Sequence, residues 1–155
     1  MRLRAEYFYS QKKFDKINFR DNNNTNYKFA PEAVQHLSAG QLLGYFNKYL
    51  ENVFAHCGTL SLEKQLFAVH DINELGIGDV LIQGGSPGHA MLIVDMAIDR
   101  KERKIFLLAQ GYMPAQDIHV VINPMSSELS PWYEMNNDTL ITSGWIFPPK
   151  HFKTW

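Results

Sequence analysis

The sequence predicts an α+β protein in which helices come first and a largely antiparallel sheet follows. Two patterns support this prediction. Apolar residues recur at helical spacing between positions 42 and 54, whereas short runs rich in Val, Ile and Leu occur between positions 79 and 110. Short turns separate those runs, and strands that meet across a short turn are most simply antiparallel. We therefore expect amino-terminal helices packed on an antiparallel sheet.

The composition is that of an ordinary globular protein. Of the 155 residues, 45 % are hydrophobic and 20 % are charged, and the length favours a single domain over residues 1–155. The formal net charge is -1 and the basic residues are scattered, so nucleic acid is not expected as a partner. No apolar run approaches the ~20 residues that span a membrane. The one cysteine, Cys57, excludes an internal disulfide.

The amino-terminal part combines a helix with short polar segments. Met1–Gln11 has helical spacing but begins without a capping residue and without the apolar centre of a signal peptide. We therefore expect an upstream segment, including an export signal, to precede Met1. Phe14–Phe19 alternates and predicts a short strand, and Asp21–Asn26 predicts a polar turn, because Asn and Asp bond their own backbone.

Two further helices are expected before the sheet. Ser38 is a good cap for the first, which Gly58 ends, and Ser61 caps the second, which continues to about Val69. One apolar stripe is expected on the first helix, formed by Leu42, Leu43, Phe46, Leu50, Val53 and Phe54. On the second helix, Leu62, Leu66 and Phe67 are expected to point inward.

The central stretch GDVLIQGGSPGHAMLIVD predicts a hairpin of buried strands. Its strands are Asp79–Gln83 and Ala90–Val94, joined by the loop Gly84–Gly88. A charged turn, Asp99–Lys104, then leads to a third strand, Ile105–Gln110. The remaining expected segments are a loop at Tyr112–Asp117, a strand at His119–Ile122, an irregular stretch at Ser126–Asp138 and a last strand at Ile141–Phe147.

His89 and Gln110 are the first candidates for chemistry. His89 opens a buried strand beside a glycine-rich loop, and Gln110 ends the next strand, so an antiparallel pairing brings them within reach. A base needs an orienting partner, and a glutamine carbonyl holds one imidazole tautomer. The alternative is that His89 bonds a loop carbonyl and only stabilises the turn.

Asp117 and His119 form a second polar pair. They lie two residues apart in a strand-like segment and therefore share a face, next to the loop that follows Gln110. They either extend the same polar cluster or cap the strand and face water. Neither His119 nor His89 belongs to a recognisable metal-ligand motif, so we expect no metal and no cofactor.

No convincing nucleophile accompanies these residues. Cys57 lies near the end of a helix, where the helix dipole disfavours a thiolate, and a cysteine in such a place is more often a small core residue. Ser86 is close to His89, but the sequence SPGH lacks the strand, sharp turn and helix that surround the serine of serine hydrolases.

The order VFAHCG, IGDVLIQ, GHAMLIVD and a following strand resembles the NlpC-type cell-wall endopeptidases, which are papain-like cysteine peptidases. The resemblance implies a papain-like (NlpC-type) core. It matches Gly78 and Asp79 to a Gly-Asp strand, His89 to the base and Gln110 to the orienting residue. The position of the cysteine falls near Phe46, where no nucleophile stands.

A second resemblance covers nearly the whole chain. The strings RLRAEYFYS, YLENVFAHCGTLSL, GDVLIQGGSPGHAMLIVD, FLLAQGYMPAQDIHVVINP and LSPWY are similar to the bacterial family called domain of unknown function 4846. Its members occur largely in Bacteroidetes-type bacteria, are longer at the amino terminus and often look exported. The resemblance therefore implies a cell-envelope or exported location, and it carries no established activity.

Three functions follow as hypotheses. The first is a papain-like hydrolase, or a descendant of one, that acts on a peptide or amide of the cell envelope through His89 and Gln110. The second is a non-catalytic module that binds a wall peptide or glycan, and the third is a structural domain of an exported protein. Enzymatic activity and oligomeric state are left open. The residues expected around the ligand are Ser86, Gly88, Tyr112, Gln116, Asp117, His119 and Trp132.

Overall fold

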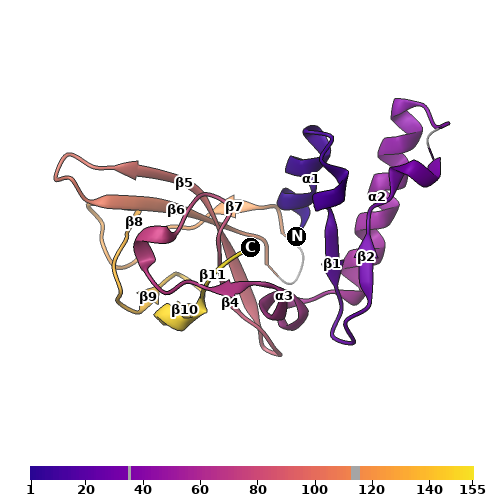
Figure 1. Ribbon diagram of the computed structural model, residues 1–155. Helices are drawn as coiled ribbons and strands as arrows, with labels where there is room; N and C mark the ends of the chain where they lie inside the picture. Colours follow the sequence, from indigo (N-terminus) through magenta and orange to yellow (C-terminus); the bar gives the residue numbers. More distant parts are fainter. Residues whose placement is uncertain (35, 113–115) are drawn as a thin grey trace. The chain divides into compact units, whose positions relative to one another are not determined.

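The computed structural model describes residues 1–34, 36–112 and 116–155, with the side chains of 33 and 34 left out (Figure 1). It has the predicted mixed α+β composition, with three α-helices in the described residues and antiparallel strand pairs. The chain divides into two compact units, Met1–Gln65 and Leu66–Trp155, and each is described by itself. The expectation of a single domain stays a prediction, because compact units of this size can belong to one cooperative domain. None of the helices in the described residues is both long and apolar enough to cross a membrane.

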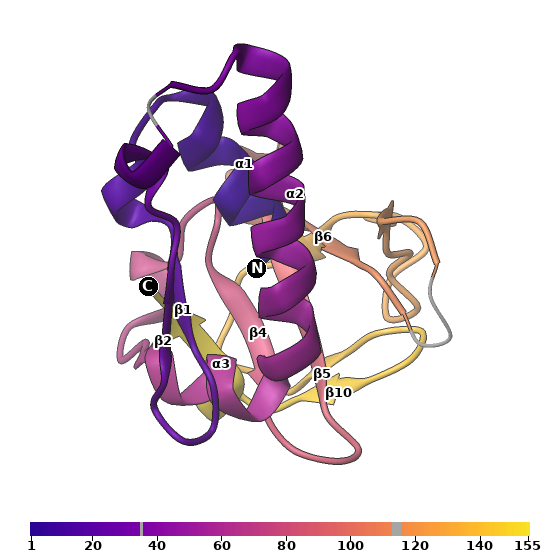
Figure 2. The same cartoon turned by 90° about the vertical axis from the view of Figure 1, so that its right-hand side faces the viewer.

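Unit 1 combines helices with one small hairpin (Figure 2). Its elements are α1 (Arg2–Ser10), η1 (Phe14–Lys16), β1 (Asn18–Arg20), β2 (Asn26–Lys28), η2 (Pro31–Val34), α2 (Ala39–His56) and α3 (Thr59–Gln65), where η marks a 3₁₀ helix. The predicted polar turn joins β1 to β2, and the carboxylate of Asp21 accepts hydrogen bonds from the main-chain N–H groups of Asn23 and Thr25 at 2.8 Å. The strand predicted from Phe14 begins only at Asn18, because the preceding residues form the 3₁₀ turn.

Helix α2 begins with the predicted Ser38 cap. Ser38 and Gln41 form a reciprocal capping box, which satisfies two otherwise unpaired N–H groups. The stripe that packs inward is narrower than predicted. It consists of Phe46, Leu50 and Val53, whereas Leu43 and Phe54 are 50 % and 45 % exposed. The aromatic core of unit 1 begins to cover the helix only at Phe46, which stacks on Tyr9 at 4.2 Å between ring centroids, and Phe54 lies about 100° around the helix from Val53.

The helix predicted from Ser61 is shorter and starts earlier. It is α3, which ends at Gln65, and Ser61 lies inside it, where its hydroxyl exchanges hydrogen bonds of 3.1 Å with the main chain of Gly58. Leu62 and Leu66 are buried as predicted. Phe67 was expected to point inward and is 67 % exposed, because it enters a strand that pairs with the carboxyl-terminal strand instead of continuing the helix.

Unit 2 contains the sheet. Its elements are β3 (Phe67–Ala68), η3 (Ile72–Glu74), β4 (Val80–Gln83), β5 (His89–Ile98), β6 (Lys104–Gln110), β7 (His119–Val120), β8 (Tyr133–Glu134), β9 (Leu140–Ile141), β10 (Ile146–Phe147), η4 (Pro149–His151) and β11 (Phe152–Thr154). The seven-stranded sheet has the order β3-β11-β4-β5-β6-β7, with β8 on β6, and its pairs are antiparallel. The predicted hairpin is therefore confirmed as β4 and β5, and the predicted third strand as β6.

The last third of the chain departs from the prediction. Ile141–Phe147 is a tight hairpin of β9 and β10, because the side chain and main chain of Thr142 bond Trp145 across a turn that contains Gly144. The stretch expected to be irregular contains β8, which pairs with β6, and the strand expected to reach Ile122 is regular only at β7. Strand β11, which the sequence did not predict, lies between β3 and β4.

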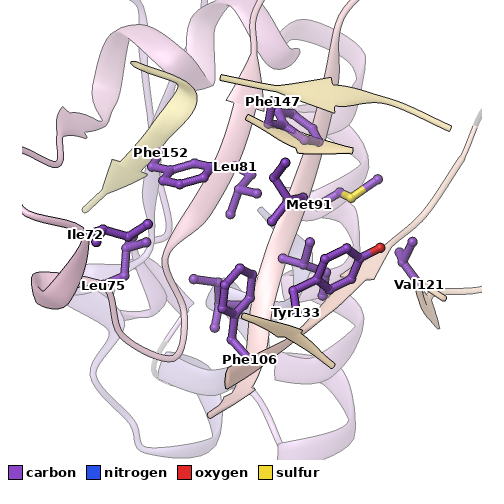
Figure 3. Close-up of a cluster of buried hydrophobic side chains, with 12 residues drawn as sticks. Ile72, Leu75, Leu81, Met91, Phe106, Val121, Tyr133, Phe147 and Phe152 are labelled. Carbon is purple, nitrogen blue, oxygen red and sulfur yellow. The ribbon is translucent and has the colours of Figure 1, made fainter. Parts of the chain in front are cut away.

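One face of the sheet carries the hydrophobic core of unit 2 (Figure 3). Met91 and Ile93 from β5 meet Phe106 and Leu108 from β6, and Phe147 from β10 packs against the same cluster. Tyr133 from β8 points its hydroxyl out of the cluster to donate a 2.7 Å hydrogen bond to the main-chain oxygen of Ile122, and burial raises the pKa of Tyr133 to about 12. The core fills one face up to the strand ends at which β4 turns into β5.

Candidate functional site

Polar side chains form a row across the strand ends of unit 2. The antiparallel register places Gln83 opposite His89, and Gln110 opposite His119. His89 shares a face with Met91, because alternate residues of a strand point to the same side. We call Gln83, His89, Gln110 and His119 the polar row. It closes the same sheet face that carries the hydrophobic core.

The centre of the polar row is a short contact between His89 and Gln110. Nε2 of His89 lies 2.7 Å from Oε1 of Gln110, and both residues are 8 % exposed. The row continues outward, because Nε2 of Gln110 lies 3.2 Å from Nε2 of His119, and Nδ1 of His119 lies 2.9 Å from the main-chain oxygen of Asp117. Three consecutive hydrogen bonds therefore link the buried imidazole to the exposed edge of the sheet.

The bond to Gln110 determines which nitrogen of His89 is available. A carbonyl oxygen only accepts hydrogen bonds, so Nε2 of His89 carries a proton and donates it. In the neutral ring, Nδ1 then keeps its lone pair. No hydrogen bond joins Nδ1 to another described residue. His89 is therefore held as an oriented imidazole whose Nδ1 has no hydrogen-bond partner within the described part of the chain.

Aromatic side chains surround the ring of His89. The ring centroids of Tyr112 and Trp145 each lie 5.3 Å from that of His89, and Phe147 stacks on it at 6.3 Å. The indole N–H of Trp145 donates to Oε1 of Gln83 at 3.4 Å, which ties this wall to the polar row. Tyr112 is 37 % exposed, so the wall presents an aromatic surface to solvent beside the imidazole.

Trp145 belongs to the surroundings of His89, where Trp132 was expected instead. Trp132 lies elsewhere in unit 2, where its main-chain oxygen accepts a 2.7 Å hydrogen bond from Asn123, and no contact joins it to the polar row among the described residues. The spacing of Trp145 and Phe147, two residues apart, indicates that they share one face of a strand. The sequence does not show that this face meets His89, because only the β9–β10 turn brings it there.

The other predicted ligand residues lie in two loops. Ser86 is exposed and Gly88 half-buried in the β4–β5 loop, and no hydrogen bond joins Ser86 to His89 in the described part of the chain. Gln116 and Asp117 are exposed, and Asp117 reaches the polar row through its main-chain oxygen rather than its carboxylate. The predicted loop Tyr112–Asp117 includes residues 113–115, which lie outside the described residues.

The Gly-Asp pair at the start of β4 has a structural role in this fold. Gly78 adopts a φ of 98°, and its N–H donates to the main-chain oxygen of Ile93 at 2.8 Å. The carboxylate of Asp79 accepts a 2.8 Å hydrogen bond from the N–H of Gly76, and its main-chain oxygen accepts from Ile93 at 2.9 Å. Both residues therefore attach the beginning of β4 to β5.

Cys57 has the properties of a core residue. It is the C-cap of α2 in unit 1 and is 5 % exposed. Burial raises the pKa of its thiol, and the negative charge of Asp21 raises it further. A thiol acts as a nucleophile only as the thiolate, so this environment opposes activation, as the sequence analysis predicted.

A separate cleft of about 200 Å³ lies near the β5–β6 turn. Arg103 on its wall binds Asp99 at 2.6 Å and approaches Glu134 at 3.5 Å, so its charge is already matched. The cleft is lined by Arg103, Asn123, Met125, Ser126, Leu129, Tyr133, Glu134, Asn136, Thr139 and Leu140. Among the described residues, no group of three or more His, Cys, Asp or Glu residues is placed to hold a metal ion. The polar row therefore offers the clearer site for chemistry.

The fold and the polar row define an α+β protein with a buried histidine–glutamine pair at the ends of adjacent antiparallel strands. The chain belongs to the family described as domain of unknown function (4846), whose model matches residues 1–154. This confirms the resemblance to that family. No curated protein matches the chain, and no solved structure matches it.

Proposed function

We propose that this chain is a papain-like, NlpC-type domain related to hydrolases, which acts on or recognises a peptide of the cell envelope. His89 is the base and Gln110 its orienting residue. The proposal rests on one observation, the 2.7 Å contact between Nε2 of His89 and Oε1 of Gln110, which leaves Nδ1 with its lone pair. A base needs such a free nitrogen and a neighbour that holds the ring in one tautomer.

The order of the strands supports the same assignment. The resemblance to NlpC-type peptidases requires the base at the start of one strand and the orienting residue on the next. His89 is the first residue of β5 and Gln110 the last of β6, and these strands are antiparallel neighbours. The cell-envelope location is inferred from the resemblance of this chain to its family and is part of the proposal.

The proposed domain lacks the usual catalytic cysteine. The corresponding position falls near Phe46, which is 2 % exposed and stacked in the aromatic core of unit 1. The thiol of Cys57 is disfavoured as a nucleophile by burial and by Asp21. Because the nucleophile, base and orienting residue act as a unit, the loss of one removes most of the rate enhancement. We therefore describe the domain as related to hydrolases.

The second candidate function is a non-catalytic module that binds a peptide or glycan. It is favoured by the aromatic wall, because Tyr112 and Trp145 flank His89 and Tyr112 is 37 % exposed. Aromatic side chains at a site supply contact area together with a polar group for orientation. A structural domain of an exported protein is the third reading, and it requires no ligand.

A single set of samples tests all three functions. The full chain is incubated with purified soluble muropeptides, products are followed by liquid chromatography with mass spectrometry, and binding is followed by the NMR signals of the His89 and Trp145 rings. The variants are His89→Ala and, as a control histidine outside the polar row, His70→Ala, which is exposed.

If the site acts on or binds a peptide, the ring signals of His89 and Trp145 should shift when muropeptide is added to the natural chain. The same shifts should occur in His70→Ala. Products that form with both and vanish with His89→Ala would establish hydrolysis. Saturable shifts without products would establish the binding module. Absence of both shifts and products at millimolar muropeptide would contradict these two functions and favour the structural domain.

A further inference from the structure

His119 lies at the outer end of the polar row and touches neither His89 nor any aromatic residue of the wall in the contacts of the described residues. We propose that His119 is a positioning residue: it selects the orientation of the Gln110 amide and thereby the tautomer of His89. We further infer that a second proton on His119 reverses this selection. That the selected tautomer serves as a base rests on the proposed function. The selection of the tautomer by His119 does not.

The main-chain oxygen of Asp117 fixes the position of the proton on His119. This oxygen can only accept, so Nδ1 of His119, at 2.9 Å, carries a proton. In neutral His119 the other nitrogen, Nε2, then holds a lone pair and accepts a hydrogen bond. Gln110 supplies it, because its Nε2 lies 3.2 Å away and bears two protons. The NH₂ end of the amide is therefore directed outward.

The same amide directs its oxygen inward. With its NH₂ end on His119, Gln110 presents Oε1 to Nε2 of His89 at 2.7 Å. That oxygen requires a donor, so His89 carries its proton on Nε2 and keeps the lone pair on Nδ1. The acceptor nitrogen of His119 therefore determines, through Gln110, which nitrogen of the buried His89 ring carries the proton.

Without an acceptor at position 119, the amide loses this preference. Rotation by half a turn places the NH₂ end of Gln110 against His89, where it can donate only to an unprotonated Nε2. His89 then carries its proton on Nδ1, and the available lone pair is directed at Gln110 instead of away from it. Both orientations are hydrogen-bonded at His89, so Gln110 by itself does not select between them.

Protonation of His119 produces the same reversal. Imidazolium donates from both nitrogens, so Nε2 of His119 can no longer accept from Gln110 and favours its oxygen instead. The titratable groups around this ring are Asp117 on its own segment and His89 on β5, reached through Gln110 on β6. The wall residues Tyr112 and Trp145 present uncharged rings. A second proton on His119 thus turns the available lone pair of neutral His89 toward Gln110, through a neighbour that the proposed reaction does not use.

Long-range ¹H–¹⁵N correlation spectra of the histidine rings test this selection directly, without ligand or turnover. Three full-length chains are compared: the natural chain, His119→Leu and His119→Gln. Leucine removes the acceptor. The amide of a glutamine does not titrate, and with its NH₂ end donating to the main-chain oxygen of Asp117 it presents Oε1 as an acceptor to Gln110. Backbone spectra verify that each chain is folded.

We expect Nε2 of His89 to be protonated in the natural chain and in His119→Gln at neutral pH. In His119→Leu its ¹⁵N signal should move toward that of an unprotonated nitrogen. When His119 carries a second proton, the Nε2 signal of neutral His89 should move in the same direction in the natural chain, whereas in His119→Gln it should not.

An unchanged His89 tautomer in His119→Leu overturns the proposal. So does a changed tautomer that His119→Gln fails to restore, because the effect is then one of lost packing. Since no substrate is present, these outcomes are independent of the muropeptide experiment, and either proposal can fail while the other stands.

Discussion

At the scale of single residues, the contact between His89 and Gln110 decides what this sheet end can do. Both side chains are polar and buried, and Nε2 of His89 and both ends of the Gln110 amide are directed along the row. A buried donor without an acceptor costs more free energy than a satisfied bond contributes. The pair is therefore strongly coupled, and disruption of one partner should be measurable in stability as well as in ligand binding.

The substitution Gln110→Leu tests this coupling. It should lower the free energy of unfolding by about 1–3 kcal/mol, because the N–H of His89 loses its acceptor while the apolar volume is largely kept. Urea denaturation measures the change. Gln116→Leu, at an exposed position, is the matched control and should stay within about 0.5 kcal/mol of the natural chain. Equal stability of the two variants would show that the pair contributes nothing.

Cys57 provides a second test at this scale. Its thiol is buried and its pKa is raised, first by burial and then by Asp21, so little thiolate exists at neutral or mildly acidic pH. We expect iodoacetamide to alkylate Cys57 more slowly than a free thiol, at the same rate in His89→Ala. Intact mass measures the rate, and the unfolded chain in guanidinium is the positive control. Fast alkylation that disappears with His89→Ala would establish a Cys–His pair and contradict the proposed loss of the nucleophile.

At the scale of elements, the β4–β5 hairpin is the part that the site depends on. Gly78 leads into it with a φ of 98°, and an added Cβ would meet no atom within 4 Å. Any cost of a side chain there comes from the backbone conformation, which L-residues other than glycine rarely adopt.

Gly78→Ala should therefore destabilise the protein by about 1–2 kcal/mol. Gly44→Ala is a control for which the opposite sign is expected. Gly44 lies inside α2, and an added Cβ would again meet no atom within 4 Å, so alanine there should stabilise the protein by about 0.5–1 kcal/mol. Thermal and urea unfolding measure both changes. A neutral Gly78→Ala would mean that the turn adapts and does not require glycine.

At the scale of the whole molecule, carboxylates with lowered pKa values are found in both units. The hydrogen bond from Arg103 lowers the pKa of Asp99 below its ordinary 3.8, and that from Lys101 lowers the pKa of Glu128. The pKa of Asp21 in unit 1 is lowered as well, because main-chain N–H groups of its turn donate hydrogen bonds to its carboxylate. These carboxylates bind protons more tightly in the unfolded chain than in the folded one.

Stability should consequently fall in acid. A lowered folded-state pKa gives a contribution that is present above the ordinary carboxyl value and is lost as the pH falls through the lowered one. The melting temperature should therefore be nearly constant from pH 7 to about pH 5 and decrease below about pH 4. Asp99→Asn should flatten that decrease, with Asp138→Asn, an exposed carboxylate, as the control. Parallel curves for Asp99→Asn and the natural chain would contradict the role of the Asp99–Arg103 pair.

Local patterns in the sequence determined the parts of the fold that depend on neighbouring residues. The Ser38 cap, the Asp21 turn and the β4–β5 hairpin follow from capping, turn chemistry and apolar alternation, which act within a few residues. The approach of His89 to Gln110 followed as well, because a hairpin and a short turn set the register of β5 and β6. The helix that was expected to continue from Ser61 failed for the opposite reason, since pairing with the distant β11 overrode the local preference at Phe67.

Only the tertiary structure decided what surrounds the histidine–glutamine pair. Trp145 reaches Gln83 across 62 residues of sequence, and β11 enters the sheet between β3 and β4 although it is last in the chain. The bond between Gln110 and His119 required the chain to return beside β6 at β7. Such contacts depend on which distant surfaces bury the most apolar area together, and local periodicity does not contain that information. The sequence by itself therefore predicted the approach of His89 to Gln110, because local turns set that register, and the tertiary structure determined the aromatic wall and the contact of Gln110 with His119.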